Sequence, residues 1–282
     1  MRPKIIIHGG FFSESSQSED TKIAKQKALE VILLKANHYL AEHTALQTVV
    51  YAVSLLEDDV LFNAGTGSQI QSDGEIRMSA SLMDGITQKF SGVINIQHIQ
   101  NPILVAQHLM DYEDRVLGGA EATFFAHQNG FQNYNPEIPQ RRTEYEAKKA
   151  SQGIGTVGCV ALDAQGNLAV ATSTGGKGFE IPGRISDSAT VAGNFANNFC
   201  AVSCTGVGED IVSGALATKI VTRVTDGLYI GKAFERSFDE LEVFDGFAGA
   251  IGIDHLGNIF HQYSHPKIVF AYQDGEKIVV FE

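Results

Sequence analysis

The chain has 282 residues, of which 44% are hydrophobic and 29 are glycine, a composition typical of a buried sheet with many tight turns. Its formal net charge of −12 argues against binding to nucleic acid, and the absence of an apolar run of about 18 residues excludes a membrane-spanning helix. Three cysteines form no disulfide framework and favour a reducing compartment, so we expect a cytoplasmic location.

The beginning of the chain predicts a buried strand followed by two helices. Ile5-Ile6-Ile7 is a short apolar run that leads into two glycines, as expected for an interior strand. Over residues 22–56, apolar side chains recur at intervals of three and four, which is the spacing of one helical face. A break in this pattern at residues 41–44 indicates two helices joined by a short turn.

Strands punctuated by glycine are expected from Asn63 onward. Ser72-Asp73-Gly74-Glu75 has the composition of a hairpin turn, so we predict paired strands over residues 68–71 and 76–82. Pro102 suits the first turn of a helix, because its missing N–H has no helical partner there. We therefore expect a helix to begin at this proline.

A polar segment divides the chain near its middle. Residues 129–151 include two prolines and a charged stretch, which indicates a loop or linker that includes a short exposed helix. Beyond it, D-x-x-G-N turns at residues 163–167 and 254–258 predict two hairpins, with helical spacing between them over residues 209–224 and 230–242. The order of strands, helices and strands predicts an α+β fold of two stacked sheets with helices on each side.

Gly155 and Thr156 lie where a backbone cut would create a catalyst. A threonine hydroxyl is a poor nucleophile unless a base lies beside it. Cleavage before Thr156 would leave a free α-amino group on the same residue, with a pKa of roughly 7.7–8.0. One residue would then supply both nucleophile and base, and Gly155 tolerates the unusual backbone angles that a scissile bond requires.

Long motifs on both sides of this junction resemble those of a known family. The run GTVGCVALDAQGNLAVATSTGG, the GRISD segment and SCTGVGE follow one another after residue 154. IIIHGG, LLEDDVLFNAGTGS, SASLMDG and QNPILVAQHLM occur in the first half. Together they resemble the plant-type L-asparaginases and isoaspartyl peptidases, which are threonine N-terminal-nucleophile hydrolases, over most of the chain.

The resemblance implies a four-layer αββα sandwich that forms one domain over residues 1–282. It also implies self-cleavage into segments 1–155 and 156–282, with a linker at about residues 133–155 before the cut. Processed units of this family pair, so we expect a homodimer. The substrates implied are L-asparagine and β-aspartyl dipeptides, whose side-chain amide would be hydrolysed through an acyl-threonine intermediate without a cofactor.

Residue roles are carried over from the family position by position. Thr156 would be the nucleophile and Thr174 would orient its hydroxyl. Arg184 and Asp187 would bind the α-carboxylate and the α-ammonium of an aspartyl unit, since a guanidinium fork matches a carboxylate. The remaining roles fall to residues on the oxyanion side and in a sodium-binding loop: Thr205, Gly206 and Asn63 for the oxyanion, and the backbone carbonyls of Leu56, Asp59, Phe62, Ala64 and Thr66 for the sodium ion.

Simpler interpretations remain open for each of these residues. Thr156 also suits a strand for packing alone, Thr174 suits a turn, and Arg184 with Asp187 also suits a surface ion pair. Hydrolysis of glycosylasparagine is the alternative reaction. A binding protein that never processes itself is the alternative from a different class. His8 is interpreted as a structural residue at the end of the first strand.

Overall fold

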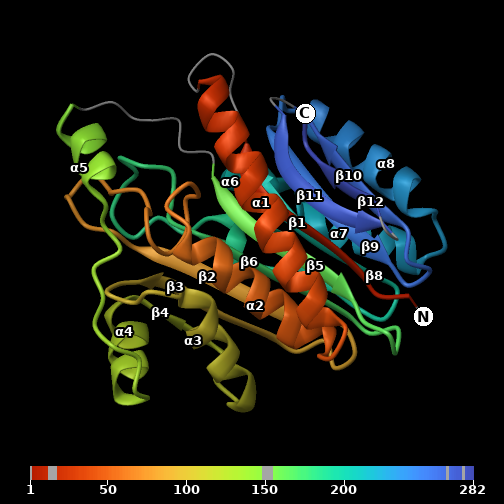
Figure 1. Ribbon diagram of the computed structural model, residues 1–282, viewed down its shortest axis with the longest axis horizontal. Coiled ribbons are helices and arrows are strands. Elements are labelled where there is room, and N and C mark those ends of the chain that lie inside the picture. The colour runs from red at the N-terminus through yellow and green to blue at the C-terminus, as the bar shows by residue number, and fades with distance from the viewer. Residues whose placement is uncertain (1, 12–17, 148–154, 265–266, 275–276) are drawn as a thin grey trace.

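Two β-sheets packed face to face carry helices on their outer faces in the computed structural model (Figure 1). The structure describes residues 2–11, 18–147, 155–264, 267–274 and 277–282. Helices and mostly antiparallel strands alternate along the chain, which agrees with the predicted α+β class. Within the described residues, no helix is long and apolar enough to cross a membrane.

The larger sheet has eight strands in the order β12-β11-β1-β5-β6-β2-β3-β4, and the smaller sheet has four in the order β10-β9-β8-β7. The larger sheet contains β1 (Lys4–Phe11), β2 (Met78–Asp84), β3 (Phe90–Ile96), β4 (Val116–Gly118), β5 (Thr156–Leu162), β6 (Leu168–Thr174), β11 (Ile268–Asp274) and β12 (Lys277–Val280). The smaller sheet contains β7 (Asn194–Ala196), β8 (Cys200–Gly206), β9 (Ala248–Asp254) and β10 (Ile259–Tyr263). Strands β5 and β6 contact β8 across the interface between the sheets.

Helices cover the sheet faces that point away from this interface. Helices α1, α2 and α3 pack on the larger sheet, while α7 and α8 pack on the smaller one (Figure 1). The helices and short 3-10 turns are α1 (Glu19–Leu40), α2 (Ala45–Asp58), α3 (Pro102–His108), η1 (Leu109–Asp111), α4 (Gly119–Gln128), α5 (Pro139–Glu146), η2 (Asp187–Ala189), α6 (Gly208–Gly214), α7 (Leu216–Thr225) and α8 (Ile230–Glu242).

Most of the predicted elements are confirmed. The first two helices separate where the sequence predicts, and Thr44 begins α2 with a capping box in which its side chain and that of Gln47 bind each other's backbone. The helix at Pro102, the short helix α5 in the polar segment and both hairpins with D-x-x-G-N turns are also present. Residues 148–154 of the predicted linker lie outside the described residues.

Two predicted elements are wrong in part. Residues 68–71 form no strand, because their backbone groups bond to other loops, as in the bond from the Gln69 N–H to the Gly175 carbonyl. The predicted hairpin is therefore a turn that leads into β2 alone. The helix predicted over residues 209–224 is broken at Ala215, whose φ of 47° lies in the left-handed region and separates α6 from α7.

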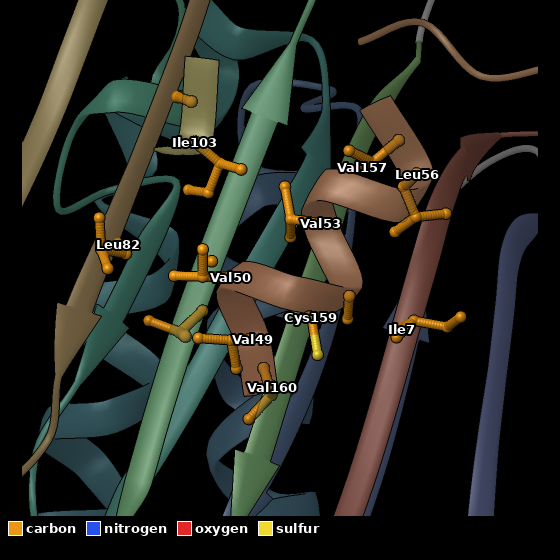
Figure 2. Packing of buried hydrophobic residues seen from close by; sticks show 14 of the residues in the cluster. Ile7, Val49, Val50, Val53, Leu56, Leu82, Ile103, Val157, Cys159 and Val160 are labelled. Atoms are coloured by element: carbon orange, nitrogen blue, oxygen red, sulfur yellow. The ribbon is translucent and has the colours of Figure 1, made fainter. Parts of the chain in front are cut away.

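In the hydrophobic core, α2 packs on the strand pair β5–β6. Figure 2 shows Val53 and Leu56 of α2 beside Val157 and Cys159 of β5, and all four side chains are fully buried. Burial of such a side chain stabilises the fold by about 1.5–3 kcal/mol. This packing fixes β5 and hence the residue at its first position, Thr156.

Register in the larger sheet sets which side chains face the smaller sheet. Thr156 pairs with Thr174, and Gly158 pairs with both Thr172 and His8. Residues that are directly opposite share one face, because side chains alternate along a strand. Thr172 contacts Ser203 of β8, so this face of β5 and β6 points to the smaller sheet.

Candidate active site

A cavity of about 90 Å³ lies at the ends of β5, β6 and β8. Of the predicted site residues, it is lined by Gly155, Thr156, Thr174, Arg184, Asp187 and Gly206. The prediction missed the other residues that line it, namely Gly176, Lys177, Ser186, Val207, Gly208 and Glu209. Segments that are distant in the sequence therefore converge on one site that has Thr156 at its wall.

Thr156 and Thr174 face each other across the β5–β6 hairpin. The Thr156 hydroxyl donates to the Thr174 hydroxyl oxygen at 3.3 Å. The Thr174 oxygen also accepts from the Gly176 N–H at 3.2 Å, and its own hydroxyl donates to the Gly155 carbonyl at 3.3 Å. Thr174 thus holds both the hydroxyl of Thr156 and the carbonyl that precedes it.

Asn63 holds the same carbonyl from the opposite side. Its side-chain amide donates to the Gly155 oxygen at 2.8 Å and to the Gly176 oxygen at 2.5 Å. Its own amide oxygen accepts from the Gln69 N–H at 3.0 Å, which fixes the orientation of the amide. A Cβ atom at position 155 would lie 2.8 Å from the Asn63 Cβ, so the close approach requires glycine there.

Arg184 is paired with Glu209, a partner that the sequence analysis did not identify. The Arg184 Nε and Nη2 groups donate to the two Glu209 carboxylate oxygens at 2.6 and 2.7 Å, a bidentate geometry. Arg184 lowers the pKa of the Glu209 carboxyl to about 2 through this contact. Glu209 is the last residue of the SCTGVGE motif, and this position was the sequence feature that could have identified it as the partner of Arg184.

Asp187 is buried beside this pair. Burial raises the pKa of its carboxyl to about 7, and its Oδ2 atom has no hydrogen-bond partner among the described residues. Gly208 leaves room for both charged groups, because a Cβ there would lie 2.9 Å from Asp187 Oδ1 and 3.0 Å from Arg184 Nη2. The Oδ2 atom of Asp187 can therefore accept a hydrogen bond from a bound cationic group.

Thr205 and Gly206 end strand β8 near the cavity. Gly206 has a φ of 142°, and a Cβ there would lie 2.5 Å from the Phe247 carbonyl oxygen, so only glycine fits. Thr205 is fully buried, and its hydroxyl has no partner among the described residues. Gly206 lines the cavity, and Thr205, which precedes it in β8, is not among the lining residues.

The predicted sodium loop begins in the last turn of α2 and continues as an irregular segment after the helix ends. Leu56 lies in the last turn of α2, where carbonyl groups lack intrahelical partners. Phe62 and Ala64 are buried, and the Asp59 carbonyl accepts a bond from the Phe62 N–H at 3.1 Å. Carbonyl oxygens are the type of ligand that a hard cation such as sodium takes.

Two buried polar contacts lie behind the site. His8 Nε2 is 2.8 Å from the Ser203 hydroxyl, which is 2.8 Å from the Thr172 hydroxyl, and burial lowers the pKa of His8 to about 3. On the helix side, the fully buried carboxyl group of Glu57 accepts a bond from the Ser173 hydroxyl at 2.6 Å. A single polar residue carries no local sequence signal for such a distant partner, so Glu57 and Ser203 could not be identified.

The segment before the junction is anchored to the site loops. Arg141 of α5 donates to the Gly67 carbonyl at 2.8 Å. The ring of Tyr145 stacks on Phe179, with centroids 5.0 Å apart and planes at 12°. These contacts connect α5 to the loop that follows Asn63 and to the loop that follows Thr174.

Comparison with known proteins gives consistent matches. The sequence matches the family described as Asparaginase over residues 1–149 and 138–281. It is 43% identical to an isoaspartyl peptidase/L-asparaginase of Nostoc sp., over 99% of this chain and 94% of that protein. It is 38% identical to an isoaspartyl peptidase of Escherichia coli, over 90% and 88% of the two chains, and 34% identical to a plant-type L-asparaginase of Pyrococcus furiosus, over 97% of both.

Proposed function

The chain belongs to the asparaginase family, and we propose that it is an amidohydrolase that cleaves L-asparagine and β-aspartyl dipeptides with Thr156 as an N-terminal nucleophile. This proposal rests on the hydrogen bonds that hold the Gly155–Thr156 junction. Asn63 and Thr174 both donate to the Gly155 carbonyl, and Thr174 also accepts from the Thr156 hydroxyl. A carbonyl held in this way beside a hydroxyl is prepared for attack.

The first reaction is cleavage of the chain itself. The Thr156 Oγ attacks the Gly155 carbonyl carbon, the Gly155–Thr156 peptide bond breaks, and the hydroxyl proton passes to the departing amide nitrogen. The Asn63 amide stabilises the negative charge that develops on the Gly155 oxygen; loss of one such donor typically costs on the order of 10²–10³ in rate. Water then hydrolyses the ester and leaves a Gly155 carboxylate and a free Thr156 amine.

The freed amine is the base for turnover. It takes the proton from the Thr156 hydroxyl as Oγ attacks the side-chain carbonyl of the aspartyl substrate. The amide C–N bond breaks, ammonia or the leaving amino acid departs with that proton, and water hydrolyses the acyl-threonine. We assign Thr205 and Gly206 to the oxyanion, because the Thr205 hydroxyl has no other partner among the described residues and Gly206 lines the cavity.

Arg184 and Asp187 orient the substrate. Glu209 binds the Nε–Nη2 edge of the guanidinium, which leaves the Nη1–Nη2 edge for an α-carboxylate. Glu209 therefore positions Arg184 and leaves it able to bind substrate. The α-ammonium pairs with the buried Asp187, whose Oδ2 atom lacks a partner among the described residues.

We also propose finer features that family membership supports. The stacking of two sheets between helices corresponds to the four-layer αββα sandwich, in one domain that processing divides into residues 1–155 and 156–282. A sodium ion at the Leu56–Thr66 loop and a homodimer follow from the family. The three buried, unpaired cysteines support a cytoplasmic location.

Mass spectrometry of the purified, incubated protein tests the nucleophile. We expect two fragments, the second beginning at Thr156, together with hydrolysis of β-Asp-Leu and L-asparagine but not of α-linked Asp-Leu. Thr156→Ala should abolish self-cleavage and lower turnover by at least about 10⁴-fold, since a missing nucleophile has no substitute. An active protein that stays intact, or a processed one that hydrolyses only glycosylasparagine, would refute the proposal.

A further inference from the structure

A tight turn directly after Thr174 carries a lysine to the rim of the cavity. Gly176 and Gly178 both have a φ of 83°, a conformation that glycine adopts without strain. The Lys177 N–H donates to Glu180 Oε1 at 3.1 Å, and Glu180 is only 4% exposed. The backbone is thus folded around a buried carboxylate, which fixes the position from which the Lys177 side chain extends.

The proposed reaction uses other charged side chains of the cavity and assigns no role to this lysine. Four charged side chains line the cavity, namely Lys177, Arg184, Asp187 and Glu209. Arg184 is bound to Glu209, and the pair formed by Arg184 and Asp187 accounts for the two charges of an aspartyl unit. Lys177 is exposed and has no ion-pair partner within 4.0 Å among the described residues, although its charge adds to that of Arg184 in lowering the pKa of Glu209.

The two proposed substrates differ in one charge. L-asparagine loses ammonia, which has no carboxylate, whereas a β-aspartyl dipeptide loses an amino acid whose carboxylate is attached to the carbon next to the scissile nitrogen. With the aspartyl unit held between Thr156, Arg184 and Asp187, the leaving residue extends toward the mouth of the cavity. Lys177 lines the cavity and is exposed, and a lysine ammonium on its flexible stem suits an exposed carboxylate.

We propose that Lys177 binds the free carboxylate of the leaving residue and thereby makes the enzyme selective for β-aspartyl dipeptides over L-asparagine. This inference rests on the proposed function and names its preferred substrate class. The carboxylate adds binding energy from a part of the substrate that does not react, which raises kcat/KM. Because the pair is exposed, its contribution falls with ionic strength.

Three substrates and three variants test the assignment on the processed enzyme. The substrates are β-Asp-Leu, β-Asp-Leu amide, which lacks the terminal carboxylate, and L-asparagine. Lys177→Met removes the charge and keeps much of the stem, Lys177→Arg restores the charge, and Lys232→Met is a matched loss of one exposed lysine on α8, outside the cavity. Mass spectrometry first confirms that each variant is processed.

We expect Lys177→Met to lower kcat/KM for β-Asp-Leu by about 5-fold, mainly through a higher KM, and to leave the amide and L-asparagine unchanged. Lys177→Arg and Lys232→Met should behave as the wild type. Added salt should reduce the wild-type preference for β-Asp-Leu over its amide. Equal losses on all three substrates, or no loss on β-Asp-Leu, would overturn the inference while the proposed function stands; a processed wild type that hydrolyses none of them would overturn both.

Discussion

The two faces of the strand pair β5–β6 have opposite characters, although their residues alternate along the same chain. Toward α2, Val157 and Cys159 are packed against apolar side chains (Figure 2). Toward the smaller sheet, Thr156, Thr172 and Thr174 present hydroxyl groups that bond to one another or to Ser203. Since side chains alternate with a period of two, every second residue of a strand can pack in the core while the residues between them direct hydroxyl groups toward the other sheet.

One buried ionisable side chain on each side of the strand pair, His8 and Glu57, has a pKa shifted in a way that favours its neutral form. His8 on the inter-sheet face has a pKa lowered to about 3, and Glu57 on the helix side has a pKa raised to about 8. Burial is the main cause in both cases, because it disfavours the charged form. The comparison of the faces therefore sets hydroxyl groups against apolar packing, with His8 and Glu57 both mainly neutral near pH 7.

Of the further substitutions that compare the two faces, Thr174→Val on the inter-sheet face is expected to have the largest effect. The change keeps the shape of the side chain but removes the hydroxyl that accepts from Thr156 and donates to the Gly155 carbonyl. We expect self-cleavage and turnover to slow by about 10²-fold, as for loss of an orienting or oxyanion donor. The rate at which the two fragments form on a gel measures the first effect.

Ser173→Ala is the matched control, because its hydroxyl points to Glu57 on the opposite face. It should lower stability by about 1 kcal/mol through the lost hydrogen bond and leave the cleavage rate within about 3-fold. Equal cleavage rates for Thr174→Val and the wild type would break the distinction between the two faces.

Val157→Ala is expected to give a smaller effect, on stability alone. The substitution deletes two buried methyl groups from the helix face, which costs about 2 kcal/mol in the free energy of unfolding. Denaturant unfolding in a Thr156→Ala background, where the chain stays intact, measures this loss. Val243→Ala, at a valine that is 86% exposed, should change stability by less than about 0.5 kcal/mol. A Val157→Ala protein of normal stability would argue against the core role of this face.

The last effect concerns the pH dependence of stability at Glu57. Its folded pKa of about 8 lies above the ordinary value of 4.5, so the folded state binds the proton more tightly than the unfolded state does. The stability contributed by that proton is present at low pH and decreases as the pH rises from about 4.5 to about 8.

Glu57→Gln removes this titration, so the difference in Tm between wild type and variant should move in favour of the variant as pH rises. At about 1.4 kcal/mol per pKa unit, the raised pKa corresponds to a change on the order of 4 kcal/mol between pH 5 and pH 9, or roughly 10 °C in Tm. Thermal melts of both proteins in the Thr156→Ala background provide the measurement. Parallel Tm curves would show that Glu57 does not titrate in this range.

Local patterns in the sequence predicted most of the fold, and contacts between distant segments account for what they missed. Helical spacing placed the turn between α1 and α2, and the D-x-x-G-N turns placed two hairpins. Residues 68–71 have the composition of a strand, but their backbone bonds to Gly175 and Glu75 and not to a neighbouring strand. No periodic pattern encodes such a loop-to-loop contact.

For the site too, local motifs predicted some residues, and contacts between distant segments account for those that were missed. Family motifs identified Thr156, Thr174 and Arg184 by their place in long runs of sequence that resemble the family, and the structure brings them to one cavity. Glu209 was overlooked at the end of such a run, although a carboxylate was needed to hold a guanidinium. Lys177 follows Thr174 by three residues, yet only the turn around Glu180 shows that it reaches the cavity rim.

The order of strands in the larger sheet affects how the protein folds and how it denatures. β1 lies between β11 and β5, and β6 lies beside β2, so segments from before and after Gly155 alternate through the sheet. A cut after Gly155 leaves the backbone hydrogen bonds between these strands in place, and the two pieces can separate only by unfolding. Folding of the intact chain is a first-order process, whereas reassembly of the two pieces is second-order and slows on dilution. The processed protein is thus expected to denature irreversibly at low concentration, because the connection that guided its folding no longer exists.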